Sequence, residues 1–166
     1  NNGLEAAALD AIVDGNDRLR TLTVQDNPMP GAELKPLAVL LGSSSSLQYL
    51  GLPGCKLGPA AGHNLAEALV FATGEALPLF HLELQNNGCT SDVGHALAAA
   101  LQGNCRLTEF KYGGNGFDAD SMAALAQAEA QIHKAWLKTD EGRHAAKAQR
   151  SRTSQASGGM SSILGD

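Results

Sequence analysis

Residues 19–29, LRTLTVQDNPM, decide the fold, because their pattern returns three more times along the chain. The further copies are LQYLGLPGCKL at 47–57, LFHLELQNNGC at 79–89 and LTEFKYGGNGF at 107–117. Each copy has apolar residues at its first, fourth, sixth and eleventh positions and Asn or Cys at its ninth. Successive copies begin 28, 32 and 28 residues apart, and a fixed period of this length is typical of repeat architectures.

Each copy predicts a short strand followed by a helix. Side chains of a strand alternate between its two faces, so Leu22 and Val24 point one way and Thr23 the other. A Leu-Ala pair on a helical pattern follows every copy in register, at Leu37-Ala38, Leu65-Ala66, Leu97-Ala98 and Leu125-Ala126. Parallel strands need a crossover of this length, so we expect an α/β fold in which the strands of successive repeats pair in parallel.

The four copies in register resemble the leucine-rich repeat family in its ribonuclease-inhibitor type. The resemblance covers about residues 1–130, or about 4.5 repeats. It implies a short horseshoe-shaped solenoid with parallel strands inside and helices outside. The first repeat is incomplete, because Leu9 matches Leu37 while no strand precedes it. We therefore expect either a fragment of a longer horseshoe or another chain that covers this edge.

A structural ladder is expected where each strand ends. The ninth positions turn the chain away from the sheet, and their buried polar side chains must find hydrogen-bond partners in neighbouring turns. These positions are Asn27, Cys55, Asn87 and Asn115. Cys55 is a weaker hydrogen-bonding group than Asn, and the resembled family commonly tolerates it there.

The chain after the repeats is predicted to form a basic helical extension over 131–150 and a Ser/Gly-rich tail over 151–166. Residues 1–132 carry six Lys and Arg against fourteen Asp and Glu, whereas residues 133–166 carry six against three. We expect Asp118 or Asp120 to cap one long helix over 121–150, with a weak point at Gly142. The predicted partner contacts of this region are Lys134, Trp136, Lys138, Arg143, Lys147, Arg150, Ile163 and Leu164.

Composition excludes some classes and favours others. Apolar residues make up 43% of the chain, which is enough for a core, but the longest apolar runs are far too short for a membrane span. Three cysteines cannot build a disulfide framework, so we expect a reducing, intracellular compartment: cytoplasm, cytoskeleton or an organelle interior.

No cluster predicts catalysis, a metal or a cofactor. Cys55, His63, His81, Cys89 and His95 lack the paired spacing of metal ligands, and the repeat frame keeps them apart. Cys105 has no orienting third group that would make it a nucleophile. The stretch 113–116, GGNG, lacks the Lys and Ser/Thr of a phosphate-binding loop.

The open face of the strands is the predicted binding surface. Its side chains have no role in the core, and solenoids build concave binding surfaces from such positions. The residues are Thr21, Thr23, Gln25, Tyr49, His81, Glu83, Gln85, Glu109 and Lys111. Tyr49 is of a type favoured at protein interfaces, and Glu83 and Glu109 are expected to attract a basic partner.

These features predict a non-catalytic protein-interaction or scaffold module, a subunit of a larger assembly. Proteins, several chains of a large complex, are the expected partners; no small-molecule substrate is expected, and nucleic acid only at the basic tail. The alternative is a regulator of a small GTPase, because some proteins of the resembled repeat type stimulate GTP hydrolysis. Here the repeats are few and the C-terminal segment is basic, which departs from those proteins.

Overall fold

Four short strands form one parallel sheet in the computed structural model, which describes residues 3–30, 34–43, 46–71, 79–102, 107–140 and 142–148. They are β1 (Thr21–Thr23), β2 (Tyr49–Gly51), β3 (His81–Glu83) and β4 (Glu109–Lys111), and they follow one another in the sheet as they do in the chain. Their central residues pair in one row, Leu22, Leu50, Leu82 and Phe110. The register predicted from the repeat spacing is therefore confirmed.

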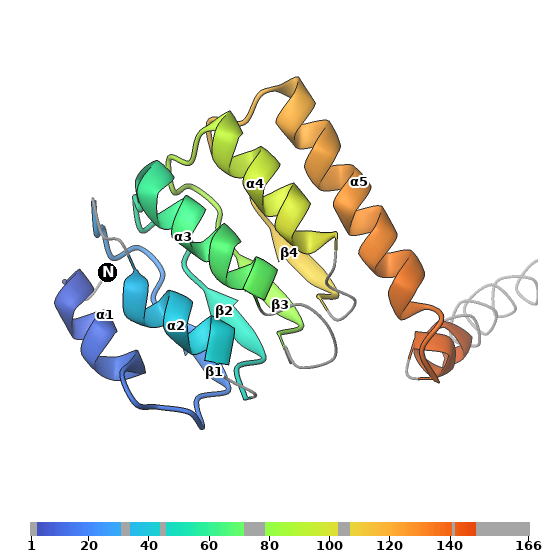
Figure 1. Cartoon of the computed structure of the whole chain (residues 1–166), viewed down its shortest axis with the longest axis horizontal. Coiled ribbons are helices and arrows are strands. Elements are labelled where there is room, and N and C mark those ends of the chain that lie inside the picture. The colour runs from blue at the N-terminus through green and yellow to red at the C-terminus, as the bar shows by residue number, and fades with distance from the viewer. Residues whose placement is uncertain are drawn as a thin grey trace, which may run out of the picture.

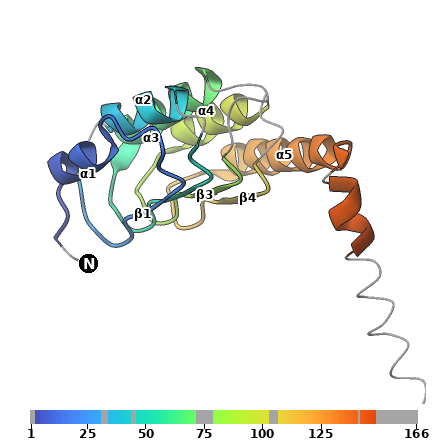
Figure 2. The ribbon, with the colours of Figure 1, turned by 90° about the horizontal axis from the view of Figure 1, so that it is seen from below.

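Every strand of the sheet is followed by a helix, and the helices lie on one side of it. The described helices are α1 (Ala6–Val13), α2 (Lys35–Ser43), α3 (Gly58–Phe71), α4 (Ser91–Leu101) and α5 (Ala119–Trp136). Figure 1 shows them as a row from α1 to α5, and Figure 2 shows the strands along the opposite side. One face of the sheet is thus buried under helices, and the other face stays open.

Leucines and small residues build the core between the sheet and the helices. Leu50 and Leu82 of the central row are at most 1% exposed, because the helices cover them completely. Small residues let neighbouring helices approach closely: a Cβ built on Gly62 of α3 would lie 3.1 Å from Val93 Cγ2 and 3.2 Å from Cys89 Sγ on the α4 side. The helix spacing therefore depends on residue size as well as on apolar character.

The chain before β1 contains the helix α1, where the sequence predicts the helical half of an incomplete first repeat. Leu9 of α1 is fully buried, which matches the buried Leu37 of α2. The N–H of Leu4 donates to Asn27 Oδ1 at 3.0 Å and fixes this segment against the first turn.

The C-terminal helix differs from the prediction of one long helix over 121–150. Asp118 is its N-cap, accepting the N–H of Ser121 at 2.8 Å, which confirms one of the two expected caps. However, α5 ends at Trp136, and a separate helical segment occupies 142–148. Thr139 explains the break, because its hydroxyl donates to the Trp136 carbonyl at 2.7 Å and accepts the Gly142 N–H at 3.1 Å.

Gly142 is required at this break for its lack of a side chain. A Cβ there would collide with the Trp136 carbonyl group. Gly142, the predicted weak point, therefore lies in the first turn of the helical segment 142–148, and the break between the two helices lies before it. The predicted boundary at 130/131 falls inside α5, where Ile132 is only 3% exposed and belongs to the core. Cys105, Arg150, Ile163, Leu164 and the rest of the segment 149–166 lie outside the described residues.

Candidate functional site

The open face of the sheet presents two rows of side chains across the strands. The first row is Thr21, Tyr49, His81 and Glu109, and the second is Thr23, Gly51, Glu83 and Lys111. Parallel pairing brings the members of each row side by side. The structure therefore collects seven of the nine residues that the sequence assigns to the open face, although they are spread over 91 positions of the chain.

Charged side chains of β3 and β4 form one connected cluster. Lys111 Nζ lies 2.7 Å from Glu83 Oε1 and 3.0 Å from Glu109 Oε1. His81 bridges the same two carboxylates, with Nε2 3.0 Å from Glu83 Oε1 and Nδ1 2.9 Å from Glu109 Oε2. A neutral imidazole has one N–H and donates to one carboxylate at a time, whereas an imidazolium donates to both.

Tyr49 of β2 extends this cluster with an aromatic ring. Its ring stacks on the His81 ring with centroids 4.4 Å apart and planes 17° apart. A Cβ on Gly51 would lie 3.0 Å from Tyr49 Cε1, so the ring rests where any other residue would place a side chain. The result is a fixed aromatic and ionic surface, which we call the Tyr49–Lys111 cluster (Tyr49, His81, Glu83, Glu109 and Lys111).

Hydrogen bonds hold Glu83 as a carboxylate. Donation from Lys111, then from His81, lowers its pKa to about 2, against an ordinary value of 4.5. The hydrogen bonds of Lys111 to Glu83 and then to Glu109 raise the pKa of its ammonium group. Burial raises the pKa of the Tyr49 hydroxyl, and Glu83 raises it further. Glu83 is only 14% exposed, whereas Glu109 is 49% exposed. Of the two acids expected to attract a basic partner, Glu109 is the accessible one.

The β1 side of the face is polar and open. Thr21, Thr23 and Gln25 are exposed, and Gln25 Nε2 donates to Asp26 at 3.3 Å. Gln85, which follows β3, is half-buried, and its side-chain oxygen is buried without a hydrogen-bond donor among the described residues. These side chains flank the Tyr49–Lys111 cluster without joining it.

The predicted ladder connects neighbouring turns through side-chain hydrogen bonds. Asn87 Oδ1 accepts the N–H of Cys55 at 3.0 Å, and its Nδ2 donates to the Leu52 carbonyl at 2.7 Å. Asn115 repeats the arrangement one turn later, since it accepts the N–H of Asn87 at 3.0 Å and donates to the Leu84 carbonyl at 2.9 Å. The ladder fixes the turns at which the strands leave the sheet.

The first two ladder residues act in the same way. Asn27 accepts from Leu4 and donates to the Gln25 carbonyl at 3.0 Å, and Cys55 Sγ lies 3.0 Å from the Val24 carbonyl. Burial raises the pKa of the Cys55 thiol, and it raises that of Cys89 to about 11. Both buried thiols therefore stay protonated near neutral pH, a state that is poorly suited to nucleophilic chemistry.

The basic extension lies beyond the sheet. Its lysines and arginine are exposed where the structure describes them: Lys134, Lys138, Arg143 and Lys147. Arg143 pairs with Asp140 and donates to the Lys138 carbonyl at 2.7 Å, so it serves the turn after α5. Trp136 is half-buried at the end of α5, on the opposite end of the molecule from α1 (Figure 1).

Within the described ranges, no three His, Cys, Asp or Glu side chains are grouped so that they could hold a metal ion. No described helix has the length and apolar character needed to cross a bilayer. One feature was not predicted from the sequence, a cavity between β4 and α5 that Phe110, Ile132 and Trp136 help to line. The signal for it was the loss of the repeat pattern after residue 130.

No protein-family model matches this chain, and no curated protein matches it. Among solved structures it is similar to one described as "Leiomodin-1 Actin-Binding Site 2 (ABS2)". The TM-score is 0.59 at 14% sequence identity, and the match covers 87% of this chain and 95% of that one. At this identity the similarity concerns the fold, a parallel sheet whose strands alternate with helices.

Proposed function

We propose that the chain is a leucine-rich repeat module of the ribonuclease-inhibitor type that binds a protein partner through the open face of its sheet, without catalysis. The observation that carries this proposal is the Tyr49–Lys111 cluster. Its five side chains do not fill the core, yet ion pairs, ring stacking and hydrogen bonds hold them in fixed positions. Side chains that are ordered before binding lose little entropy when a partner docks on them.

The cluster favours a partner that offers both an apolar contact and a basic group. Tyr49 and the imidazole of His81 form a flat ring surface, which suits an apolar or cationic side chain. Glu109 is the most exposed acid beside it, at 49%. Because Lys111 compensates only part of the negative charge, a Lys or Arg of the partner would find an acceptor at the β4 side.

The similar structure is described as an actin-binding site, which supports a protein-binding function and makes actin the first partner to test. Cosedimentation with actin filaments and a titration of fluorescently labelled monomeric actin cover both states of that protein. If actin binds, the expected localisation is the cytoskeleton. A role as subunit of a larger assembly is part of the same proposal, and proximity labelling in the source cells supplies further partners for reconstitution.

Paired variants test the surface itself. Tyr49→Ala removes the ring from the open face, whereas Val39→Ala changes an equally apolar side chain on α2 that is 67% exposed. We expect Tyr49→Ala to lower the affinity for a purified partner about tenfold or more, as for an aromatic interface anchor, and Val39→Ala to leave the affinity unchanged. Equal affinities for both variants would contradict binding through the open face.

The alternative, a regulator of a small GTPase, uses the same surface and is tested separately. A panel of purified small GTPases is incubated with the chain, and GTP hydrolysis is followed by phosphate release. No stimulation is expected. Stimulation that is lost in Tyr49→Ala would replace the non-catalytic proposal with the regulatory one.

A further inference from the structure

Two backbone groups on the outer side of β4 have no hydrogen-bond partner among the described residues. The carbonyl of Phe80 accepts the N–H groups of Thr108 at 2.8 Å and Glu109 at 3.1 Å, and the N–H of Leu84 donates to Lys111 at 2.7 Å. Thr108 corresponds to Phe80 one repeat later, and Tyr112 corresponds to Leu84. The carbonyl of Thr108 and the N–H of Tyr112 therefore point to where a fifth strand would lie. Among the described residues, none bonds to these two groups, and the sheet ends at β4.

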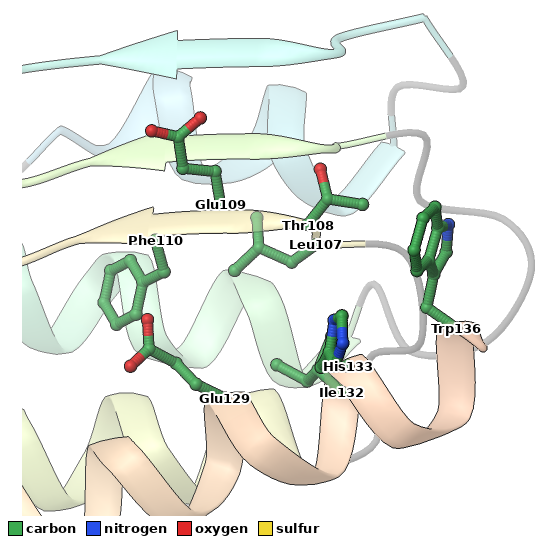
Figure 3. Close-up of a pocket in the computed structure, with 8 residues that line it drawn as sticks. All are labelled: Leu107, Thr108, Glu109, Phe110, Glu129, Ile132, His133 and Trp136. Atoms are coloured by element: carbon green, nitrogen blue, oxygen red, sulfur yellow. The ribbon is translucent and has the colours of Figure 1, made fainter. Parts of the chain in front are cut away.

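A cavity of about 430 Å³ adjoins this edge, between β4 and α5. Figure 3 shows Ile132, His133 and Trp136 extending from α5 beside the strand, with the Phe110 ring at the other end of the cavity, next to Glu129. Phe110 and Ile132 are 7% and 3% exposed, so they form an apolar floor, while Trp136 is half-buried at one end. The edge therefore combines strand-spaced hydrogen-bonding groups with an adjacent apolar groove.

The described part of the chain does not continue into a fifth strand at this place. The positions 28 residues after Leu107, Phe110 and Tyr112 are Ala135, Lys138 and Asp140. None of the three matches the large apolar residues of the repeat, and there the structure has the end of α5 and the turn before the helix at 142–148. At 18 residues, α5 is also longer than the 11-residue α4, and its last turns form the wall of the groove.

We propose that this edge binds an extended segment of a partner protein, which adds to β4 as a fifth strand. The backbone of the segment pairs with the outer groups of β4, and its central apolar side chain enters the groove over Phe110 and Ile132. This is strand addition, in which main-chain bonds give affinity and side-chain pockets give specificity. The site is distinct from the Tyr49–Lys111 cluster, and the inference does not rest on the function proposed for that cluster.

Charge indicates a basic residue beside the apolar one. A residue that pairs with Glu109 from the outer side would stand across from it as His81 does from the inner side, and opposite charges in such cross-strand pairs are favourable. Glu129 adds a second carboxylate at the groove; its Oε2 accepts only the Tyr112 hydroxyl, at 3.1 Å, among the described contacts. The segment therefore reads apolar-x-basic-apolar-x-apolar, in the register of the missing repeat.

The chain contains a single tryptophan, Trp136, so its fluorescence reports on the groove directly. The probe is a capped synthetic peptide with the core Leu-Thr-Lys-Leu-Thr-Leu, added to the full chain. We expect a saturable shift of the Trp136 emission and slower hydrogen exchange at the N–H groups of Phe110 and Tyr112. The same peptide N-methylated at its lysine cannot donate from that residue to the Thr108 carbonyl, as the Glu109 N–H donates to the Phe80 carbonyl one repeat earlier, and it should bind about tenfold more weakly or worse.

Two substitutions complete the test. Trp136→Ala should lower the affinity for the peptide about tenfold, as measured by hydrogen exchange. Leu137 is an exposed neighbour that does not line this groove, so Leu137→Ala should leave the affinity unchanged. If Trp136→Ala fails to fold, the N-methylated peptide still decides. Equal binding of both peptides, or no saturable signal up to millimolar peptide, would overturn the proposal.

Hydrogen exchange without peptide identifies the other occupants. Slow exchange at Phe110 and Tyr112 that grows with protein concentration, together with a doubled mass by light scattering, would assign the edge to a second copy of this chain. Slow exchange that is independent of concentration would assign it to a segment of the same molecule. Either result would overturn the partner segment, because the edge would already be filled.

Discussion

Replacing Asn87 by alanine should separate the second and third turns of the ladder. The side chain is 1% exposed and bonds to the N–H of Cys55 at 3.0 Å and to the carbonyl of Leu52 at 2.7 Å. Asn87→Ala leaves both backbone groups buried without these partners. An orphaned buried group costs about 1–3 kcal/mol, so we expect a loss of about 2–4 kcal/mol once partial hydration of the space is allowed for.

The assay is urea unfolding of the full chain, with a thermal melt beside it. For a chain of this size the loss corresponds to a fall in Tm of about 5–15 °C. The m-value should be unchanged, because the surface exposed on unfolding is the same. Asn16→Ala is the matched control, since Asn16 is exposed and the substitution keeps its backbone N–H, which donates to the Val13 carbonyl. Its unfolding midpoint should stay within error of the wild type.

Hydrogen exchange locates the effect. The Cys55 N–H should lose protection in Asn87→Ala, whereas amides of α5, two repeats away, should exchange more quickly only as far as global stability falls. A variant whose unfolding curve overlays that of the wild type would refute the reasoning, because the ladder would then contribute nothing to holding the turns together.

Three further changes probe other parts of the structure. Glu83→Gln should lower the free energy of unfolding by up to about 3 kcal/mol at neutral pH. The pKa of Glu83 falls from 4.5 in the unfolded chain to about 2 in the folded one, so its stabilisation is present above pH 4.5 and is lost as the pH falls toward 2. The urea unfolding curves of variant and wild type should therefore converge near pH 2. Gly62→Ala should destabilise by about 1–3 kcal/mol in a thermal melt, since its Cβ would press on Val93, and an unchanged melt would show that α3 and α4 can move apart freely. Thr139→Ala removes the cap of the helix at 142–148 and should raise amide exchange at Gly142, at a cost of about 1 kcal/mol to that helix; unaltered exchange would assign the break to another residue.

The repeated part of the fold could be predicted because its spacing determines its register. Residues 28 or 32 apart must meet on adjacent strands if every repeat folds alike, and Leu22, Leu50, Leu82 and Phe110 do so. The faces followed from strand alternation, which placed Tyr49, His81 and Glu83 on the open side. Both conclusions depend on periodicity, which a sequence displays directly.

The details of the site could not be predicted in this way. That Glu83 is enclosed by Lys111, His81 and Tyr49 depends on rotamers across three strands, and no spacing encodes these. The break after Trp136 was missed because the helical pattern of apolar residues continues to that position. Its cause, Thr139, acts through a local side-chain bond that competes with the helix, and such bonds are visible only in the structure.

Among the described elements, substantial contacts join each helix to its neighbouring helices and each strand to its neighbouring strands along the row, from α1 and α2 to α4 and α5. A tensile load on the chain would therefore meet a series of similar small barriers in place of a single large one. Pulled by its ends, the protein should lengthen in steps, one strand-and-helix unit at a time, and recoil in the same increments when released. A module of this construction can stretch between two attachment points without losing the units that remain folded.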